Sequence, residues 1–133
     1  MVNKIGQEQT IETNRITEFR KVDEERQIVW GVVYEPDKVD TQGDFASAEE
    51  IEKAAHQFLE GYNQVGLMHN ESLSKKANVV ENYLAPIDFI LGEGKVKKGA
   101  WVMAVHIVDN DIWEQVKKGE LNAFSMGGIS QRR

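Results

Sequence analysis

Two segments carry apolar residues on both alternating faces, and this pattern predicts strands that are covered on both sides. In residues 27–34, aromatic and aliphatic side chains fall on one face and valines on the other. Residues 100–108 show the same two-sided pattern. A further strand-like segment, residues 15–22, precedes the first of these, and Asp23-Glu24-Glu25 predicts a hairpin turn between them.

The clearest helical pattern begins at Ser47. This serine and Glu50, three residues later, fit a capping box. Gly61 is expected to mark the end of the helix. The stripe of apolar residues at helical spacing comprises Ile51, Ala54, Ala55, Phe58, Leu59 and Tyr62.

A second, shorter helix is predicted near the end of the chain. Asp109 or Asn110 can cap it, and Gly119 follows its last turn. Its apolar positions are Ile112, Trp113 and Val116.

Three more segments read as strands: residues 64–69, 78–91 and 122–130. Pro86 interrupts the second because proline cannot donate to a ladder, and residues 92–99 are expected to form a turn region. The order β-β-α-β-β-β-α-β lacks regular βαβ alternation. It therefore favours an α+β fold, a mostly antiparallel, β-barrel-like sheet with two packed helices.

Length and composition limit the chain to one domain. The chain has 133 residues and no cysteine, which excludes disulfides, thiolate metal sites and cysteine nucleophiles. Residues 1–14 are polar and without periodicity, so we expect a flexible N-terminal arm followed by a folded domain over residues 15–133. No apolar run approaches the roughly 18 residues that a membrane span needs, so we expect no membrane contact.

The charge of −6 is distributed unevenly along the chain. Residues 1–66 hold 14 Asp and Glu against 7 Lys and Arg, whereas residues 67–133 hold 8 against 9. An acidic chain without a long basic stripe is a poor ligand for phosphate backbones, so we expect no nucleic acid partner. The acids of residues 40–44 lack the pattern of a calcium loop, and we expect neither a metal nor a cofactor.

Few residues could serve as a catalytic base, because the chain has only three histidines. His56 lies off the apolar stripe of the first helix and is expected at the surface, and His106 lies within a strand. His69 ends an apolar segment where the chain enters a polar loop, which is a common place for reactive groups. Judged alone, His69 fits a structural role better than a catalytic one.

Ser125 is the candidate nucleophile. Strand alternation puts it on the face opposite Phe124 with only a small neighbour, and Gly127-Gly128 follows. Glu81 lies among apolar strand residues, where a carboxylate could orient an imidazole. Judged alone, Ser125 is better explained as a strand serine before a glycine bulge. Glu81, judged alone, is better explained as a carboxylate that points to water.

A series of short motifs occurs in order between Trp30 and Gly128, and together they resemble the phage prohead serine proteases of the XkdF-like group. Those proteases are similar to the capsid-maturation proteases of tailed phages and herpesviruses. The motifs are Val33-Tyr34-Glu35-Pro36-Asp37, Val39-Asp40-Thr41-Gln42-Gly43-Asp44, Ala48-Glu49-Glu50-Ile51, Leu67-Met68-His69, Val80-Glu81-Asn82-Tyr83, Ala85-Pro86, Trp101-Val102, Ile112-Trp113 and Phe124-Ser125-Met126-Gly127-Gly128.

The resemblance implies a serine endopeptidase with Ser125 as nucleophile and His69 as general base. In the herpesvirus proteases, the third member of the catalytic triad is a histidine that follows the serine. No histidine follows Ser125 here, so Glu81 is the first candidate for that role and His106 is the second. Only eight residues follow Ser125, and the resemblance therefore leaves open a domain cut from a longer protein or a processed form.

The resemblance also implies the substrates and the place of action. We expect cleavage of phage scaffold and capsid precursor proteins, and of the protease itself, inside the procapsid in the host cytoplasm. Exposed strand edges predict self-association as well. The alternative is a catalytically dormant protease-like domain that serves as a structural or scaffold-binding module of the phage head.

Overall fold

The computed structural model describes residues 16–39, 43, 45–62, 65–66 and 76–126. The expected arm, residues 1–14, lies outside the described residues. In chain order the elements are β2 (Ile16–Asp23), β3 (Ile28–Tyr34), α1 (Ala48–Gln57), a π-helical turn (Phe58–Tyr62), β4 (Val65–Gly66), β5 (Ala77–Leu84), β6 (Phe89–Leu91), β7 (Gly94–Val96), β8 (Trp101–Ile107), α2 (Asn110–Lys117) and β9 (Ala123–Met126).

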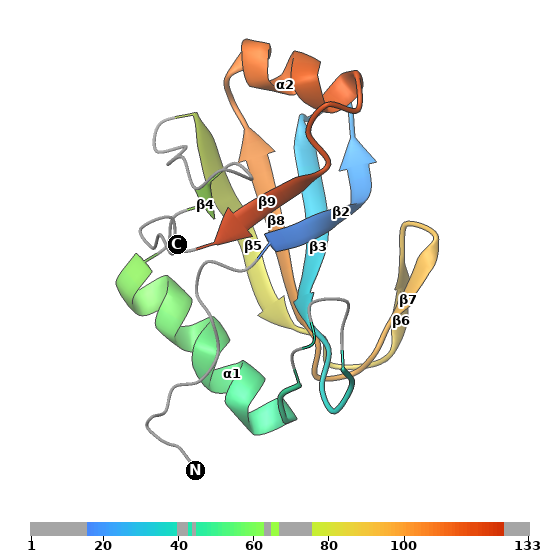
Figure 1. Ribbon diagram of the computed structural model, residues 1–133, viewed down its shortest axis with the longest axis vertical. Coiled ribbons are helices and arrows are strands. Elements are labelled where there is room, and N and C mark those ends of the chain that lie inside the picture. Colours follow the sequence, from blue (N-terminus) through green and yellow to red (C-terminus); the bar gives the residue numbers. More distant parts are fainter. Residues whose placement is uncertain (1–15, 40–42, 44, 63–64, 67–75, 127–133) are drawn as a thin grey trace.

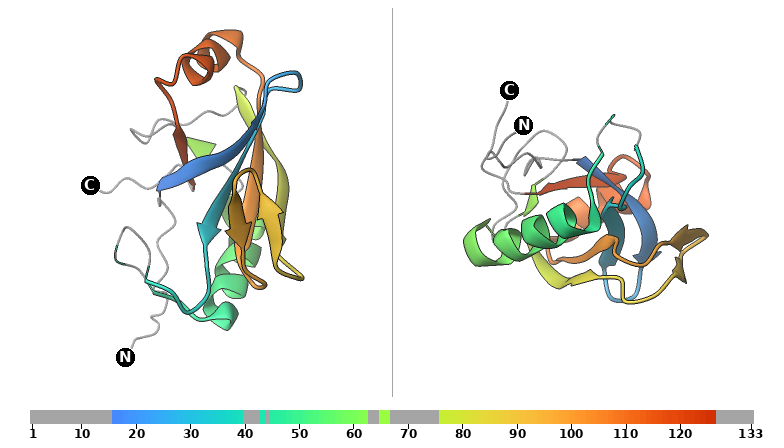
Figure 2. Two further views of the ribbon diagram at one scale, coloured as in Figure 1. Left: turned by 90° about the vertical axis from the view of Figure 1, so that its right-hand side faces the viewer. Right: turned by 90° about the horizontal axis from the view of Figure 1, so that it is seen from below.

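One curved sheet holds most of the strands, in the order β4-β9-β2-β3-β8-β5. Every neighbouring pair in it is antiparallel. The sheet bends far enough that its two edge strands, β4 and β5, also contact each other. Figure 2 shows this curvature from two further directions. The predicted α+β class, a barrel-like antiparallel sheet with two helices, is confirmed.

The two-sided strands β3 and β8 form the centre of the fold, as their sequences predict. One face of the sheet packs under α1 and α2, and its core includes Val29, Val33, Trp101, Met103 and Val105. The opposite face packs under the β6–β7 hairpin, and its core includes Trp30, Leu91, Val96, Val102 and Ala104. In Figure 1, α1 and the hairpin accordingly lie on opposite sides of the sheet, and α2 lies at one end of it.

Both helices begin with the predicted caps. Ser47 and Glu50 form the complete capping box of α1, and the Asp109 side chain accepts a hydrogen bond from the backbone N–H of Asp111 at the start of α2. The end of α1 differs from the prediction. The α-helix ends at Gln57, and Gly61 lies inside the π-helical turn that follows.

The region between β5 and β8 also differs from the prediction. The expected strand over residues 78–91 is two strands, because Pro86 and its neighbours separate β5 from β6. The expected turn region contains β7, which pairs with β6. The turn between them places Gly92, at a φ of 64°, directly against β2, where a Cβ atom would lie 2.0 Å from the Arg20 carbonyl oxygen. The hairpin therefore reaches across the sheet and packs its tip on β2.

Candidate active site

Ser125 lies on β9 between two strands. In the register it lies opposite Ile16 of β2 on one side and Gly66 of β4 on the other. Its side chain is 1% exposed. The glycine contributes no side chain beside Ser125, so the flank toward β4 is formed by backbone, whereas the flank toward β2 carries an isoleucine.

Phe124 fixes which way Ser125 points. The Phe124 ring is buried in the core under the helices, and its centroid lies 6.1 Å from that of Phe19. Because successive side chains of a strand point to opposite faces, Ser125 projects to the face away from that core. A shift of one residue in the pairing would bury Ser125 with the helices and expel Phe124, so the apolar anchor specifies the register.

The predicted base, His69, lies outside the described residues. It follows Gly66, the last residue of β4, by three positions in the sequence. The pairing of Gly66 with Ser125 thus brings β9 beside the strand from which the chain continues toward His69. The role of His69 stays a prediction. Gly127 and Gly128, the possible oxyanion donors, also lie outside the described residues.

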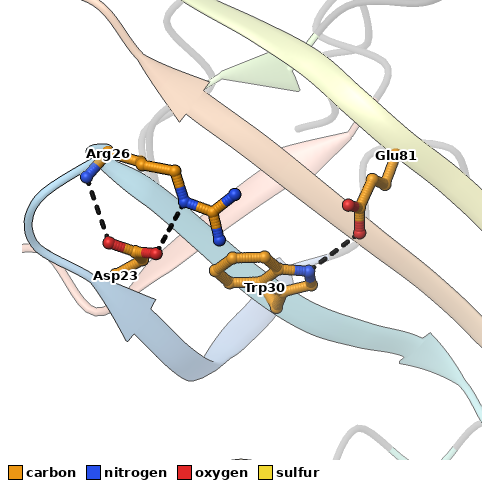
Figure 3. Close-up of polar contacts among 4 residues, drawn as sticks. All are labelled: Asp23, Arg26, Trp30 and Glu81. Carbon is orange, nitrogen blue, oxygen red and sulfur yellow. Dashed lines mark hydrogen bonds and ion pairs between the residues drawn. The ribbon is translucent and has the colours of Figure 1, made fainter.

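Glu81 lies on β5. In the strand order of the sheet, β2, β3 and β8 lie between β5 and β9. The Oε1 atom of Glu81 accepts a hydrogen bond of 2.9 Å from Trp30 Nε1, as Figure 3 shows. Lys21 Nζ lies 4.5 Å from the centroid of the Trp30 ring. Within the part of the chain that the structure describes, Glu81 forms no hydrogen bond to Ser125. The orienting role predicted for Glu81 stays a prediction.

Two described groups have shifted pKa values with clear electrostatic causes. Burial raises the pKa of the Tyr83 hydroxyl, and the nearby charge of Glu81 raises it further. At the β2–β3 turn, the backbone and side-chain N–H groups of Arg26 donate to Asp23 and lower the pKa of that carboxyl group (Figure 3). Both shifts have local structural causes, and neither involves Ser125.

The other two histidines lie on α1 and on β8. His56 is exposed on α1, as predicted. His106 is half-buried on β8, where the register pairs it with Ile28 and with Asn78.

Among the described residues, no group of three or more His, Cys, Asp or Glu side chains could hold a metal ion. No described helix is long and apolar enough to cross a membrane.

The sequence pattern does not single out three residues that the structure brings into view. Trp30 reads as a core position, and its hydrogen bond to Glu81 joins strands 51 residues apart. Gly66 and Glu18 come near Ser125 only through the pairing of β4 and β2 with β9. A correct alignment of β9 with β2 would have found Glu18, and one of β9 with β4 would have found Gly66.

Two proteins of Bacillus subtilis (strain 168) are similar to this chain. It is 44% identical over 108 residues to the uncharacterized protein YqbD, covering 81% of this chain and 33% of that protein. It is 44% identical over 107 residues to the phage-like element PBSX protein XkdF, covering 80% of this chain and 38% of that protein. The chain therefore spans little more than a third of the length of these relatives.

No solved structure matches this chain. The sequence profile of one protein family does match it, over residues 15–133, and that family is described as "Putative phage serine protease XkdF". The match covers both β9, with Ser125, and the segment that contains His69. By this match, and by its likeness to the PBSX protein, the chain belongs to the putative phage serine protease XkdF family.

Proposed function

We propose that this chain is the protease domain of a serine endopeptidase that cleaves phage scaffold and capsid precursor proteins, and itself, during head maturation. The reaction would take place inside the procapsid, in the host cytoplasm. The observation that carries the proposal is the pairing of Ser125 with Gly66, three residues before His69, in a chain that belongs to this family. Self-association of the chain, which the sequence predicts, is part of the same proposal.

The proposed chemistry needs one nucleophile and one base. Ser125 Oγ attacks the carbonyl carbon of the scissile peptide bond, and His69 takes the hydroxyl proton. The tetrahedral intermediate then collapses, the C–N bond breaks, and His69 returns the proton to the leaving amine. Water hydrolyses the acyl-enzyme by the same steps and restores the Ser125 hydroxyl. No cofactor takes part.

Glu81 is the proposed third residue, and the Trp30 contact makes its role testable. If Glu81 orients His69, Glu81→Gln should slow the reaction by several orders of magnitude, as loss of a triad carboxylate does. If Glu81 serves only the Trp30 indole, the variant should keep the reaction rate and lose stability. His106→Gln tests the second candidate for this role in the same assay.

The burial of Ser125 favours a second candidate function. A side chain that is 1% exposed cannot meet a peptide carbonyl without movement of its surroundings. A dormant protease-like domain that acts as a structural or scaffold-binding module of the head would fit a closed site. The two functions differ in one outcome, the cleavage of head precursors.

Co-production with phage head precursor proteins tests the proposal. We expect new N-termini on the precursors with the wild-type chain and none with Ser125→Ala or His69→Ala, while the circular dichroism of each variant stays that of the wild type. Cleavage that persists with Ser125→Ala would refute the assignment of the nucleophile. Intact precursors with the folded wild-type chain would favour the dormant module.

A further inference from the structure

We propose that Glu18 gives the Ser125 site a preference for substrates with a basic residue near the scissile bond. This inference rests on the proposed function and adds the charge of the substrate to it. It depends on which side chains of β2 lie on the same face of the sheet as Ser125. The pairing of β2 with β9 defines those side chains.

The register places Glu18 on the same face as Ser125. Ile16 lies opposite Ser125, Thr17 opposite Phe124, and Glu18 opposite Ala123. Directly opposed residues in an antiparallel pair point to the same face. Because Phe124 points into the core under the helices, Glu18 and Ser125 both point away from it.

The same register sets the separation of the two side chains. Glu18 is the diagonal neighbour of Ser125, and such neighbours lie about 7–8 Å apart. A peptide bound with its scissile carbonyl at Ser125 Oγ would therefore place an adjacent side chain within reach of the Glu18 carboxylate. The pairing of β2 with β9 holds the two residues side by side, so a ligand that reaches the buried Ser125 side chain also meets Glu18.

Glu18 is available to a substrate. Its side chain is exposed, and it makes no ion pair with any residue that the structure describes. A carboxylate that orients a catalytic imidazole is normally buried and hydrogen-bonded. An exposed carboxylate with no ion-pair partner in the described part of the chain instead suits a group that meets a charge brought by the ligand.

The neighbours of Glu18 indicate what kind of charged side chain fits. Ile16 is half-buried and Ala123 is buried, so the surface between Ser125 and Glu18 is apolar at its base. Lysine and arginine pack an aliphatic stem on such a surface while the charged end reaches a carboxylate. A peptide with lysine or arginine beside its scissile bond is the substrate class that matches both features.

Reagents of different charge test this preference at Ser125 itself. A fluorophosphonate forms a bond from Ser125 Oγ to phosphorus, the P–F bond breaks, and fluoride and the hydroxyl proton are released. We would measure the rate of this reaction by intact mass with a reagent that has a trimethylammonium tail and with its neutral tert-butyl counterpart. The proteins are the wild type, Glu18→Gln and Glu24→Gln.

The wild type should react faster with the cationic reagent, by about threefold at low salt for a unit charge at 7–8 Å in a water-like dielectric, and by more if the site excludes water. Salt near 0.5 M should reduce this ratio toward 1, because the screening length falls to a few ångströms. Glu18→Gln should abolish the preference. Glu24→Gln is the matched control, since it removes the same charge from an exposed turn about 20 Å along the chain from Glu18, and it should leave the preference intact.

Two results would overturn the inference while the proposed function stands. One is an unchanged preference in Glu18→Gln. The other is an equal loss of rate with both reagents in a folded Glu18→Gln protein, which would make Glu18 part of the reaction rather than of substrate choice. If the folded wild type reacts with neither reagent, the proposed function itself is refuted, and this inference falls with it.

Discussion

Asn82 links the first helix to the centre of the sheet, and its replacement should destabilise the protein more than any exposed change on the same strand. Trp101 Nε1 donates a 2.7 Å hydrogen bond to Asn82 Oδ1, and Asn82 Nδ2 donates a 3.3 Å hydrogen bond to the Ala55 carbonyl oxygen in α1. Trp101 is 1% exposed. Its N–H group therefore has no access to water if the acceptor is removed.

The magnitude follows from these contacts. Asn82→Leu leaves the Trp101 N–H buried without a partner, at a cost of about 1–3 kcal/mol, and removes the longer bond to Ala55, worth about 0.5 kcal/mol. We expect a net loss of about 2–3 kcal/mol in the free energy of unfolding. At an unfolding entropy of about 2.1 cal/mol/K per residue, that loss lowers the melting temperature by about 7–11 °C.

Urea unfolding of a double-mutant cycle tests this explanation. Trp101→Phe removes the indole donor, so Asn82→Leu should cost about 1–2 kcal/mol less in the Trp101→Phe background than in the wild type. Asn78→Leu is the matched control, since Asn78 is exposed on the same strand, and it should change stability by less than about 0.5 kcal/mol. Equal costs of Asn82→Leu in both backgrounds would refute the role of the hydrogen bond.

Four further substitutions have definite expected outcomes. Thr17→Val should raise the free energy of unfolding by about 1–2 kcal/mol, because Thr17 Oγ1 is buried and has no hydrogen-bond partner among the described residues. Lower stability in urea would contradict this. Gly92→Ala should cost more than the roughly 1–2 kcal/mol of a left-handed alanine, because the new Cβ would also meet the Arg20 carbonyl oxygen. Gly119 has a φ of 79°, and an added Cβ atom would meet nothing within 4 Å, so Gly119→Ala should cost only the conformational part. Equal melting temperatures of the Gly92→Ala and Gly119→Ala proteins would refute the close approach of the hairpin to β2. Asp23→Asn should be less stable than the wild type at neutral pH, and the difference should shrink as the pH falls through the lowered pKa of Asp23, since protonation removes the advantage of its bonds to Arg26. A difference that stays constant between about pH 7 and pH 2 would contradict this.

Local patterns predict the elements whose signals lie close together in the sequence. The two-sided strands β3 and β8 and the capping box at Ser47 and Glu50 need only neighbouring residues to be recognised. The hairpin strands β6 and β7 have three residues each, which is too short for a clear alternation. They are held by packing against the buried face of the sheet, and a local pattern does not contain that contact.

The arrangement around Ser125 depends on contacts between distant parts of the chain. The alternation of Phe124 and Ser125 predicts which side chain leaves the core, but it does not predict that Ile16 and Gly66 become the neighbours of Ser125. In the same way, Glu81 reads from the sequence as a free carboxylate among apolar residues. Its hydrogen bond to Trp30 arises because β8 brings β3 and β5 to its two sides.

The most direct test of the central claim is the intact mass of the protein after exposure to a small fluorophosphonate. Three proteins are compared: the wild type, Ser125→Ala and His69→Ala, each shown to be folded by its cooperative thermal unfolding. A serine activated by a histidine predicts one adduct on the wild type, located at Ser125, and none on either variant. No adduct on the folded wild type, or the same adduct on Ser125→Ala, would contradict the claim that Ser125 is the nucleophile of this protein.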